Sequence, residues 1–382
     1  MSHVFKPLLR WGPPLTLAAL FLLFVLWLNS AEKIPLVVRQ GQSFETGVVI
    51  NILRDNLQPD GTRAGEQRVL VKMTSGVRAG EAIETTSSSG YLFGAWCTVG
   101  MKVIVIQSVA GDSTVSAVYA QDRGGVLLLF AGLYLLTLCL VGGRQGIKGA
   151  LGLLFTFLCI LFVYLPMVGR SWSPFWTAVF VCVVTTLVTL WLIGGPTKKT
   201  AVAVGGTVAG VVIAGAAASL FSAASGITGW NVSDIESLMS LASAGDIQVG
   251  GLLFSGLLIS SLGAVMDVAM SIASAIREIY DQNPALSRPD LFRAGMRVGR
   301  DLMGTDSNTL ILAFAGSSAS MLVLDYAYDL PFLQIINSNN IGIAVMQGLS
   351  GSFGIVLAVP VTVLLAAVVY PWNKPWKISP PV

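Results

Sequence analysis

Long runs of apolar residues dominate the pattern of the chain and recur along most of its length. A run of about 20 apolar residues can cross the hydrocarbon core of a bilayer as a helix. Eight runs are candidates for such spans, at residues 15–28, 124–142, 147–168, 174–194, 201–221, 249–276, 305–324 and 342–370. The pattern therefore predicts an α-helical polytopic membrane protein with about eight spans. Composition agrees, because only 11% of the residues are charged, against about 25% in soluble domains.

The interval between the first two runs has a different pattern. Four short segments alternate apolar and polar residues with a period of two, as strands do, at residues 45–53, 67–73, 101–109 and 113–121. We expect one small extracytoplasmic β-rich, barrel-like domain over residues 31–123, because about 90 residues suffice for a compact domain. It shows no acid pair, glycine loop or basic patch, which favours a packing or interaction role over catalysis.

The first apolar run follows Lys6 and Arg10 and is either a signal peptide or a signal anchor. Small residues are expected before a cleavage site, but Asn29-Ser30-Ala31 has asparagine at the first of the three positions. We therefore interpret 1–30 as an uncleaved N-terminal signal-anchor span. The expected divisions of the chain are this span, the β domain over 31–123, a seven-span transmembrane domain over 124–372 and a short cytoplasmic tail over 373–382.

Basic residues are concentrated in alternate loops, namely Lys6 and Arg10, Arg144 and Lys148, Lys198 and Lys199, the connector 277–300, and Lys374 and Lys377. The alternate short loops carry Arg170 and otherwise acidic residues or none. Because loops rich in lysine and arginine stay in the cytoplasm, this pattern places both termini in the cytoplasm and the β domain outside. The net charge of +3 gives no case for nucleic-acid binding, so the expected partner is the lipid bilayer.

One acidic residue interrupts the sixth apolar run. Asp267 is the only charge between Asp246 and Arg277, and a helical rise of about 1.5 Å per residue places it about 15 Å from the cytoplasmic edge. An ionisable residue at that depth is costly, which makes it a functional hypothesis. Its helix face carries small and polar residues, at Ser260, Gly263, Ser271, Ser274 and Glu278. We predict that Asp267 and Ser271 belong to a proton- or ion-coupling site. The alternative is a hydrogen-bonded aspartate that holds helices together.

A polar, basic connector joins the sixth and seventh runs. Ser287-Arg-Pro-Asp290 is a capping box that predicts the start of a helix. Behind it, apolar residues lie opposite a basic stripe formed by Arg293, Arg297 and Arg300. This pattern predicts an amphipathic helix at the cytoplasmic interface, whose arginines contact lipid headgroups rather than a substrate.

The seventh run opens with Asp306 and Asn308. Asp306 is readable either as the N-cap of that helix, a position that favours aspartate, or as a polar partner of Asp267. We include both residues in the proposed coupling site. The last run contains closely spaced glycines, which together with Gly263 predict close packing against the helix that carries Asp267: Gly348, Gly351 and Gly354.

Several kinds of chemistry have no residues to support them. His3 is the only histidine, so histidine-based zinc sites and Ser-His-Asp triads are excluded. No HExxH, Ser-Lys or GxGD pattern of an intramembrane protease occurs, and the four cysteines show no CxxC spacing. We therefore expect no enzyme activity, no metal and no cofactor.

The segments GAVMDVAMSIASAI at 263–276, AGMRVGRDLMGT at 294–305 and NTLILAFAGSS at 308–318 resemble the YibE/F-like family of bacterial multi-pass membrane proteins. GQSFETGVV at 41–49 and the β domain resemble it as well. The resemblance implies a protein of the bacterial cytoplasmic (inner) membrane, and it implies no particular biochemical activity.

A more distant similarity is to the transmembrane core of the export factors SecD and SecF and of the resistance-nodulation-division (RND) exporters. It rests on the order of a mid-membrane aspartate, a basic connector, the segment Asp306-Ser-Asn308-Thr309 and a glycine-rich span. The chain departs from that core by two additional helices before the Asp267 helix.

Two functional hypotheses follow. In the first, the protein is a proton- or cation-coupled transporter or export factor in which Asp267 titrates, with Ser271, Asp306 and Asn308 as polar partners. A homo-oligomer or a paralogous membrane partner would then complete the bundle. In the second, the protein is a non-transporting scaffold or accessory subunit whose β domain binds a partner.

Overall fold

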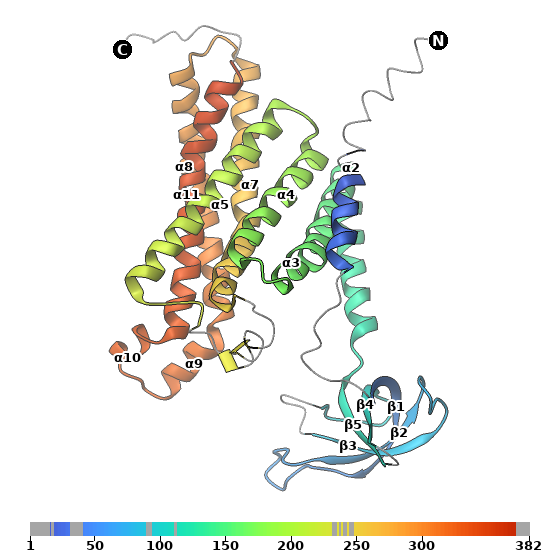
Figure 1. The fold of residues 1–382 in the computed structure, drawn as a ribbon. Coiled ribbons are helices and arrows are strands. Elements are labelled where there is room, and N and C mark those ends of the chain that lie inside the picture. The colour runs from blue at the N-terminus through green and yellow to red at the C-terminus, as the bar shows by residue number, and fades with distance from the viewer. Residues whose placement is uncertain are drawn as a thin grey trace, which may run out of the picture. The chain divides into compact units, whose positions relative to one another are not determined.

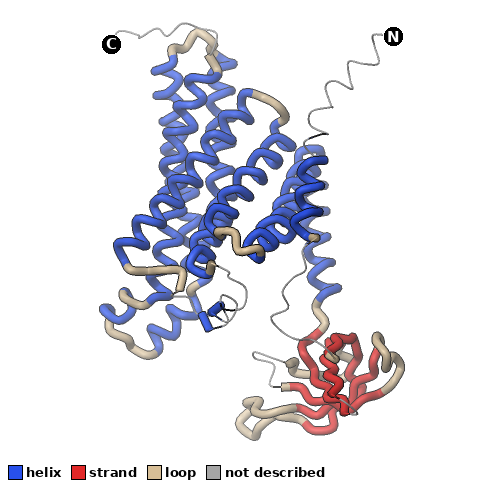
Figure 2. The backbone as a smooth tube through the Cα atoms, viewed as in Figure 1, coloured by secondary structure: helices blue, strands red, loops and turns tan. Residues whose placement is uncertain are grey.

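The structure is a computed structural model that describes residues 16, 19–30, 41–88, 94–110, 113–230, 235–236, 238–239, 243 and 248–371. The predicted tail at 373–382 lies outside these residues. The chain divides into two compact units, one over Pro35–Thr137 and the other formed by Met1–Ile34 together with Leu138–Val382 (Figure 1). The named strands all belong to the first unit, whereas the second consists of helices and their connections (Figure 2).

Five strands form a closed barrel in the first unit. They are β1 (Gln42–Arg54), β2 (Gln67–Met73), β3 (Ala82–Ser87), β4 (Lys102–Ala110) and β5 (Ser113–Gln121). Their order around the barrel is β1-β2-β3-β5-β4, and every pair is antiparallel except the parallel pair of β3 and β5. A five-stranded barrel of this kind has the architecture of oligonucleotide- and oligosaccharide-binding folds. Architecture alone assigns no function.

The four predicted strand segments coincide with β1, β2, β4 and β5, and the alternation that predicted them reflects burial. In β2 the residues that point inward, Val69, Val71 and Met73, are at most 1% exposed, while Arg68 and Lys72 on the other face are exposed. β3 was not predicted, because Ile83 is the only large apolar residue in its sequence AIETTS. The barrel-like domain is thus confirmed as a five-stranded barrel.

The second unit is helical. α2 (Gly124–Cys159) begins in the first unit and continues into the second. The elements that follow it are the π-helical η1 (Ile160–Tyr164), α3 (Leu165–Gly169), α4 (Pro174–Gly194), α5 (Lys198–Ser225), the 3₁₀ turn η2 (Val249–Gly251), α7 (Leu252–Gln282), α8 (Arg288–Ser317), α9 (Ala319–Ala327), α10 (Phe332–Ile336) and α11 (Asn339–Val369). Among the described residues, five helical segments are long and apolar enough to cross a membrane. α8 and α9 pass the same test as a pair bent by 58°. The chain therefore has the character of a membrane protein.

The two apolar runs at 124–142 and 147–168 fall in one helical segment that is broken at Gly143. This glycine has a φ of 52° and a ψ of −131°, which is not helical. A Cβ atom built on Gly146 would lie 2.0 Å from the carbonyl oxygen of Leu138, eight residues earlier and thus about 12 Å away along a straight helix. The chain therefore turns back on itself at Gly143, and Gly146 has no side chain to obstruct the turn.

The N-terminal helix packs against the other helices of the second unit. Its apolar part spans Ala19–Asn29, and Leu28 at its end is only 2% exposed. Arg170 donates hydrogen bonds of 2.7 and 2.8 Å to the carbonyl oxygens of Trp27 and Leu28. Its guanidinium group also stacks 4.4 Å from the centre of the Trp27 ring. A cation at this end of a helix offsets the partial negative charge of the last carbonyls.

Glycine residues allow α5 and α11 to cross closely at the centre of the bundle. A Cβ atom on Gly206 would lie 2.0 Å from Oγ1 of Thr362, and one on Gly210 would lie 2.8 Å from Cβ of Ala358. Such small-residue contacts are typical of membrane helices, which lack a hydrophobic driving force for association within lipid. This crossing forms part of the core against which α7 and α8 pack.

The prediction that the amphipathic helix of the connector is separate from the span beginning at residue 305 is wrong. α8 runs without interruption from Arg288 to Ser317, and the chain bends only afterwards, into α9. Gly295 and Gly299 let the first half of α8 lie directly on the bundle. Cβ atoms there would come within 2.7 Å of Ile276 on α7 and 2.4 Å of Val359 on α11. The basic half of α8 is therefore a packed continuation of the next helix.

Candidate functional site

Asp267 lies at the midpoint of α7, a helix of 31 residues, and its side chain is exposed. The residues that share its face are exposed as well, at Ser260, Gly263, Ser271 and Glu278. On the opposite face, Val265, Val268 and Ile272 are fully buried against the other helices. The predicted polar stripe is therefore continuous, and in the described part of the chain it points away from the packed core.

Asp306 is the charged group that the structure brings next to Asp267. It is half-buried and lies on the face of α8 whose Gly295 and Gly299 approach Ile276 and Ile272 of α7. The N-cap interpretation of Asp306 is wrong, because α8 begins 18 residues earlier. Its N-cap is Ser287, whose Oγ accepts a hydrogen bond of 3.3 Å from the backbone N–H of Asp290. The predicted capping box thus exists, and Asp306 lies inside a helix.

Asn308 does not join this pair. Two residues along an α-helix correspond to a rotation of about 200°, so Asn308 points to nearly the opposite side of α8 from Asp306. Its side chain is exposed. Ser271, by contrast, follows Asp267 by one turn on the same exposed face of α7. Of the four residues proposed for coupling, Asp267, Ser271 and Asp306 lie on the α7–α8 side of the bundle and Asn308 faces outward.

The glycines predicted to pack α11 against α7 have three different neighbours. Gly348 lies nearest to α8, at 3.8 Å, and Gly351 contacts both α8 and Ser261 of α7. Gly354 packs against α5 instead, where a Cβ atom would lie 2.8 Å from a backbone carbonyl. Gly263 has no atom within 4 Å of such a Cβ position, because it lies on the exposed face of α7.

Two positioning residues were missed by sequence reasoning, namely Gly295 and Gly299. By allowing α8 to approach α7 and α11, they set the rotation of α8 and hence turn Asp306 inward. Their spacing, Gly-x-x-x-Gly within AGMRVGR, is a packing signal for membrane helices. It was overlooked because the segment was interpreted as an interfacial helix.

The carboxyl groups of Asp267 and Asp306 form no hydrogen bond or ion pair within the described part of the chain. Two neighbouring carboxylates repel each other when both are ionised, and a shared proton or a bound cation removes that repulsion. Among the described residues no group of three or more His, Cys, Asp and Glu side chains could hold a metal ion. The arrangement is therefore suited to handling a proton or a weakly held cation.

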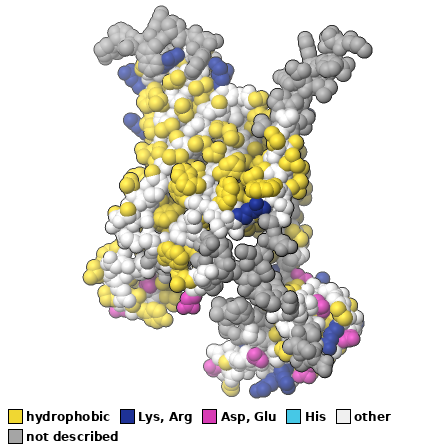
Figure 3. Space-filling model, in the orientation of Figure 1, with side chains coloured by type: hydrophobic (Ala, Val, Ile, Leu, Met, Phe, Trp, Pro, Cys, Tyr) yellow, Lys and Arg dark blue, Asp and Glu magenta, His cyan; other side chains and the backbone are white. Residues whose placement is uncertain are grey.

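Basic side chains gather around the end of the helical unit where α7 connects to α8, as Figure 3 shows. Arg293, Arg297 and Arg300 are all exposed there, on the outer face of α8. Arg293 lies 3.4 Å from Asp290, in an ion pair whose two members are 74% and 38% exposed. The basic stripe is thus present on the outer face of α8.

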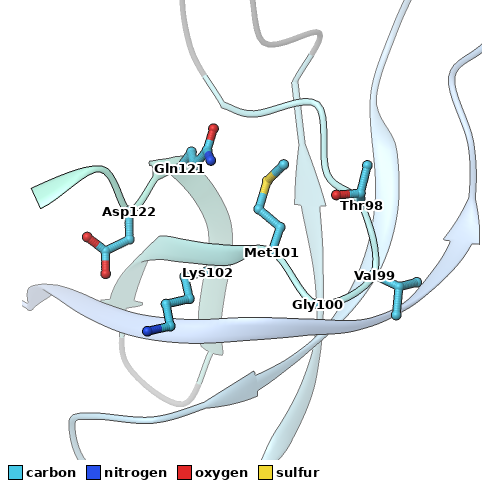
Figure 4. Close-up of a pocket in the computed structure, with 7 residues that line it drawn as sticks. All are labelled: Thr98, Val99, Gly100, Met101, Lys102, Gln121 and Asp122. Carbon is cyan, nitrogen blue, oxygen red and sulfur yellow. The ribbon is translucent and has the colours of Figure 1, made fainter. Parts of the chain in front are cut away.

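A shallow hollow occurs in the barrel (Figure 4) and is lined by Thr98, Val99, Gly100, Met101, Lys102, Gln121 and Asp122. It lies where β5 ends and includes two ionisable side chains, Lys102 and Asp122. These offer no acid pair or nucleophile–base pair. The hollow therefore gives no support for catalysis in the barrel.

A model of the YibE/F-like protein family matches residues 130–372. The match includes both Asp267 and Asp306 and leaves the β-barrel outside it. No curated protein and no solved structure matches the chain. The similarity to SecD, SecF and the RND exporters therefore stays a prediction.

Proposed function

Since the chain belongs to the YibE/F-like family, and the family-matched region holds the two neighbouring acids, we propose that it is a proton- or cation-coupled membrane transporter or export factor. In this proposal Asp267 takes up and releases the coupling ion, and Asp306 is the neighbouring charge. The observation that carries the proposal is the exposed Asp267 at the midpoint of α7, with the half-buried Asp306 on the face of α8 that packs against α7.

The energetics of the bilayer support this assignment. An ionised aspartate at the centre of a membrane helix costs at least about 2.5–3.5 kcal/mol. The exposed stripe of serine, glycine and aspartate on α7 must therefore meet water or another protein surface rather than lipid. A stripe of hydroxyl groups beside two carboxyl groups offers successive polar contacts to a proton or cation moving through the membrane.

We further propose eight spans in the bacterial cytoplasmic membrane, with both termini in the cytoplasm and the barrel outside. The helices supply that number if the N-terminal helix, the two arms that meet at Gly143, α4, α5, α7, the bent pair α8–α9 and α11 each cross once. Alkaline phosphatase fused within 74–80 is expected to be active, and green fluorescent protein fused after Val382 to be fluorescent. The reverse pattern would contradict this topology.

Labelling with dicyclohexylcarbodiimide tests the coupling site without knowledge of the substrate. This apolar reagent modifies protonated carboxyl groups in apolar surroundings. We expect Asp267 to be modified in the reconstituted protein, and we expect the extent of modification to decrease as pH rises. If the coupling ion is a cation other than the proton, that cation is also expected to decrease the modification. Asp301, an exposed acid on α8, is the matched control. Modification of Asp267 that is absent at every pH, or independent of pH and cations, would refute the proposal.

Substitution of the acid gives a second test. Asp267→Asn keeps the size of the side chain and removes its charge. We expect it to abolish pH-gradient-driven flux in proteoliposomes while insertion and thermal unfolding stay as in the wild type. Asp301→Asn is expected to leave flux unchanged. Wild-type flux in Asp267→Asn would rule out its role as the coupling residue.

The hydration of α7 can be measured directly. In a variant whose four cysteines are replaced by alanine, Ser260→Cys and Ser271→Cys are expected to react with a water-soluble methanethiosulfonate reagent. Val212→Cys, on an apolar part of α5 that is 55% exposed, is expected to be much slower. Equal, slow reaction at all three positions would show that water does not reach the stripe.

One observation favours the scaffold alternative. The outer surface of the barrel exposes Phe44, Val115 and Tyr119 by 45%, 67% and 50%, and the rings of Phe44 and Tyr119 contact each other at 5.2 Å. Exposed apolar patches of this kind are typical of interaction surfaces. Loss of function in a Phe44→Ser/Tyr119→Ser variant, together with full function of Asp267→Asn, would establish the scaffold role.

A further inference from the structure

The outer face of α8 carries three arginine side chains that its packing keeps away from the other helices. Arg293, Arg297 and Arg300 are spaced by four and three residues and are exposed. Gly295 and Gly299, on the other side of the helix, are buried against α7 and α11. Because these glycines leave no room for a side chain, α8 cannot rotate to bring the arginines inward.

The positive charge of this face is partly compensated by two acids on α8, Asp290 beside Arg293 and the exposed Asp301 after Arg300. The contact of Arg293 with Asp290 is an exposed pair at 3.4 Å, and such pairs contribute little. Within the described part of the chain, Arg297 and Arg300 form no ion pair. The face therefore presents two guanidinium groups outside any ion pair and about one turn apart, a spacing at which both can reach one phosphate group.

The same face continues toward the other end of α8 as an uncharged surface that includes the exposed, polar Asn308. One turn beyond Arg300 lies Gly304, where a Cβ atom would meet nothing within 4 Å. About two turns further, Ile311 is 39% exposed. α8 together with α9 is long and apolar enough to cross a membrane, so the arginines lie toward the polar edge of the span. Arginine side chains in that position extend their charged ends to the headgroup level.

We propose that the outer face of α8, from Arg293 to Ile311, is a binding site for an anionic phospholipid. Arg297 and Arg300 hold the headgroup phosphate, and an acyl chain lies in the open space at Gly304 and along Ile311. The charge complementarity selects a lipid with net negative charge, such as phosphatidylglycerol, over zwitterionic phosphatidylcholine. Each arginine near an anionic membrane surface contributes about a five-fold preference. This inference does not depend on the proposed coupling site.

The test uses the full chain, purified and delipidated in mild detergent, with fluorescent phosphatidylglycerol as the probe. Arg297→Gln/Arg300→Gln is expected to weaken binding of the probe roughly 25-fold. Arg68→Gln/Arg78→Gln removes the same charge from exposed positions on the barrel and is expected to bind as the wild type does. The wild type is expected to bind phosphatidylcholine no better than the α8 variant binds phosphatidylglycerol.

Four results would overturn the proposal. The first is that wild type and α8 variant bind phosphatidylglycerol equally, and the second is that the barrel control weakens binding of the probe as much as the α8 variant does. The third is that the wild type binds phosphatidylglycerol no better than phosphatidylcholine. The fourth is that glycerol 3-phosphate displaces the probe at comparable concentration, which would indicate a site for soluble phosphate. Thermal unfolding in phosphatidylcholine nanodiscs checks that the glutamine variant is folded. If it is not, Arg297→Lys/Arg300→Lys replaces it. This lysine variant keeps the charge and is expected to retain the preference for phosphatidylglycerol, so loss of that preference in a folded lysine variant also overturns the proposal.

Discussion

The close crossing of α5 with α7 and α11 can be tested by adding one methyl group. In Gly210→Ala the new Cβ atom would lie 2.5 Å from Cγ1 of Val265, 2.8 Å from Cβ of Ala358 and 3.0 Å from the carbonyl oxygen of Gly354. Ordinary contact lies between 3.4 and 4 Å. The valine can change rotamer, but the other two atoms belong to or adjoin the backbone of α11. The two helices must therefore separate by several tenths of an ångström.

The size of the effect follows from two opposing contributions. Alanine is favoured over glycine inside a helix by about 1 kcal/mol, and overpacking a tight contact costs about 1–3 kcal/mol. Gly263→Ala is the matched control, because Gly263 lies inside α7 and has nothing within 4 Å of its Cβ position. The helix contributions cancel between the two variants. We therefore expect Gly210→Ala to be less stable than Gly263→Ala by about 1–3 kcal/mol, toward the upper end because backbone must move.

The assay is reversible unfolding in mixed micelles with increasing dodecyl sulfate, followed by the fluorescence of the nine tryptophans. Gly263→Ala is expected to unfold at or above the wild-type dodecyl sulfate fraction, and Gly210→Ala below it. Equal stability of the two alanine variants would refute the packing of α5, α7 and α11 described above. A Gly263→Ala variant that is strongly destabilised would show that the outer face of α7 is covered by another surface.

Three further predictions concern separate parts of the chain. Arg170→Gln removes the cation over the Trp27 ring and is expected to make the N-terminal helix more accessible to protease, with Lys148→Gln as a control that leaves digestion unchanged. Ser287→Ala removes the N-cap of α8 and is expected to lower the free energy of unfolding by about 1 kcal/mol; no loss would contradict the cap. Burial raises the pKa of the Cys97 thiol. Alkylation of Cys97 at pH 8 is therefore expected to be far slower than that of a free thiol until the barrel unfolds. Rapid labelling of Cys97 in the folded protein would contradict its burial.

The sequence predicted the barrel well because strands that bury one face carry a direct record of that burial. β2 shows it most clearly, since buried and exposed residues alternate through QRVLVKM. β3 lacks such a record, because its inward positions include Thr85 and Ser87. From the sequence alone, threonine and serine at these positions are expected to be exposed to solvent. Their burial follows only from closure of the barrel.

The helical unit was harder to predict, because in a membrane polarity does not distinguish the inside of a bundle from its outside. Periodicity identified which residues share a face with Asp267, but the direction of that face depends on neighbouring helices. Gly295 and Gly299 determine the rotation of α8, and with it the fact that Asp306 faces the bundle while Asn308 faces outward. The break at Gly143 arises from a backbone conformation that glycine permits. Because glycine also occurs inside helices, its presence in the sequence does not predict the break.

The contact between Arg170 and the N-terminal helix has a consequence for synthesis of the protein. Trp27 and Arg170 are 143 residues apart, and translation adds about 5–20 residues per second. The first helix therefore waits roughly 7–30 seconds for its partner, while the entire barrel sequence is made. During that interval the hydrogen bonds from Arg170 to Trp27 and Leu28 cannot form, so this helix is fixed to the rest of the bundle only after residue 170 has been synthesised.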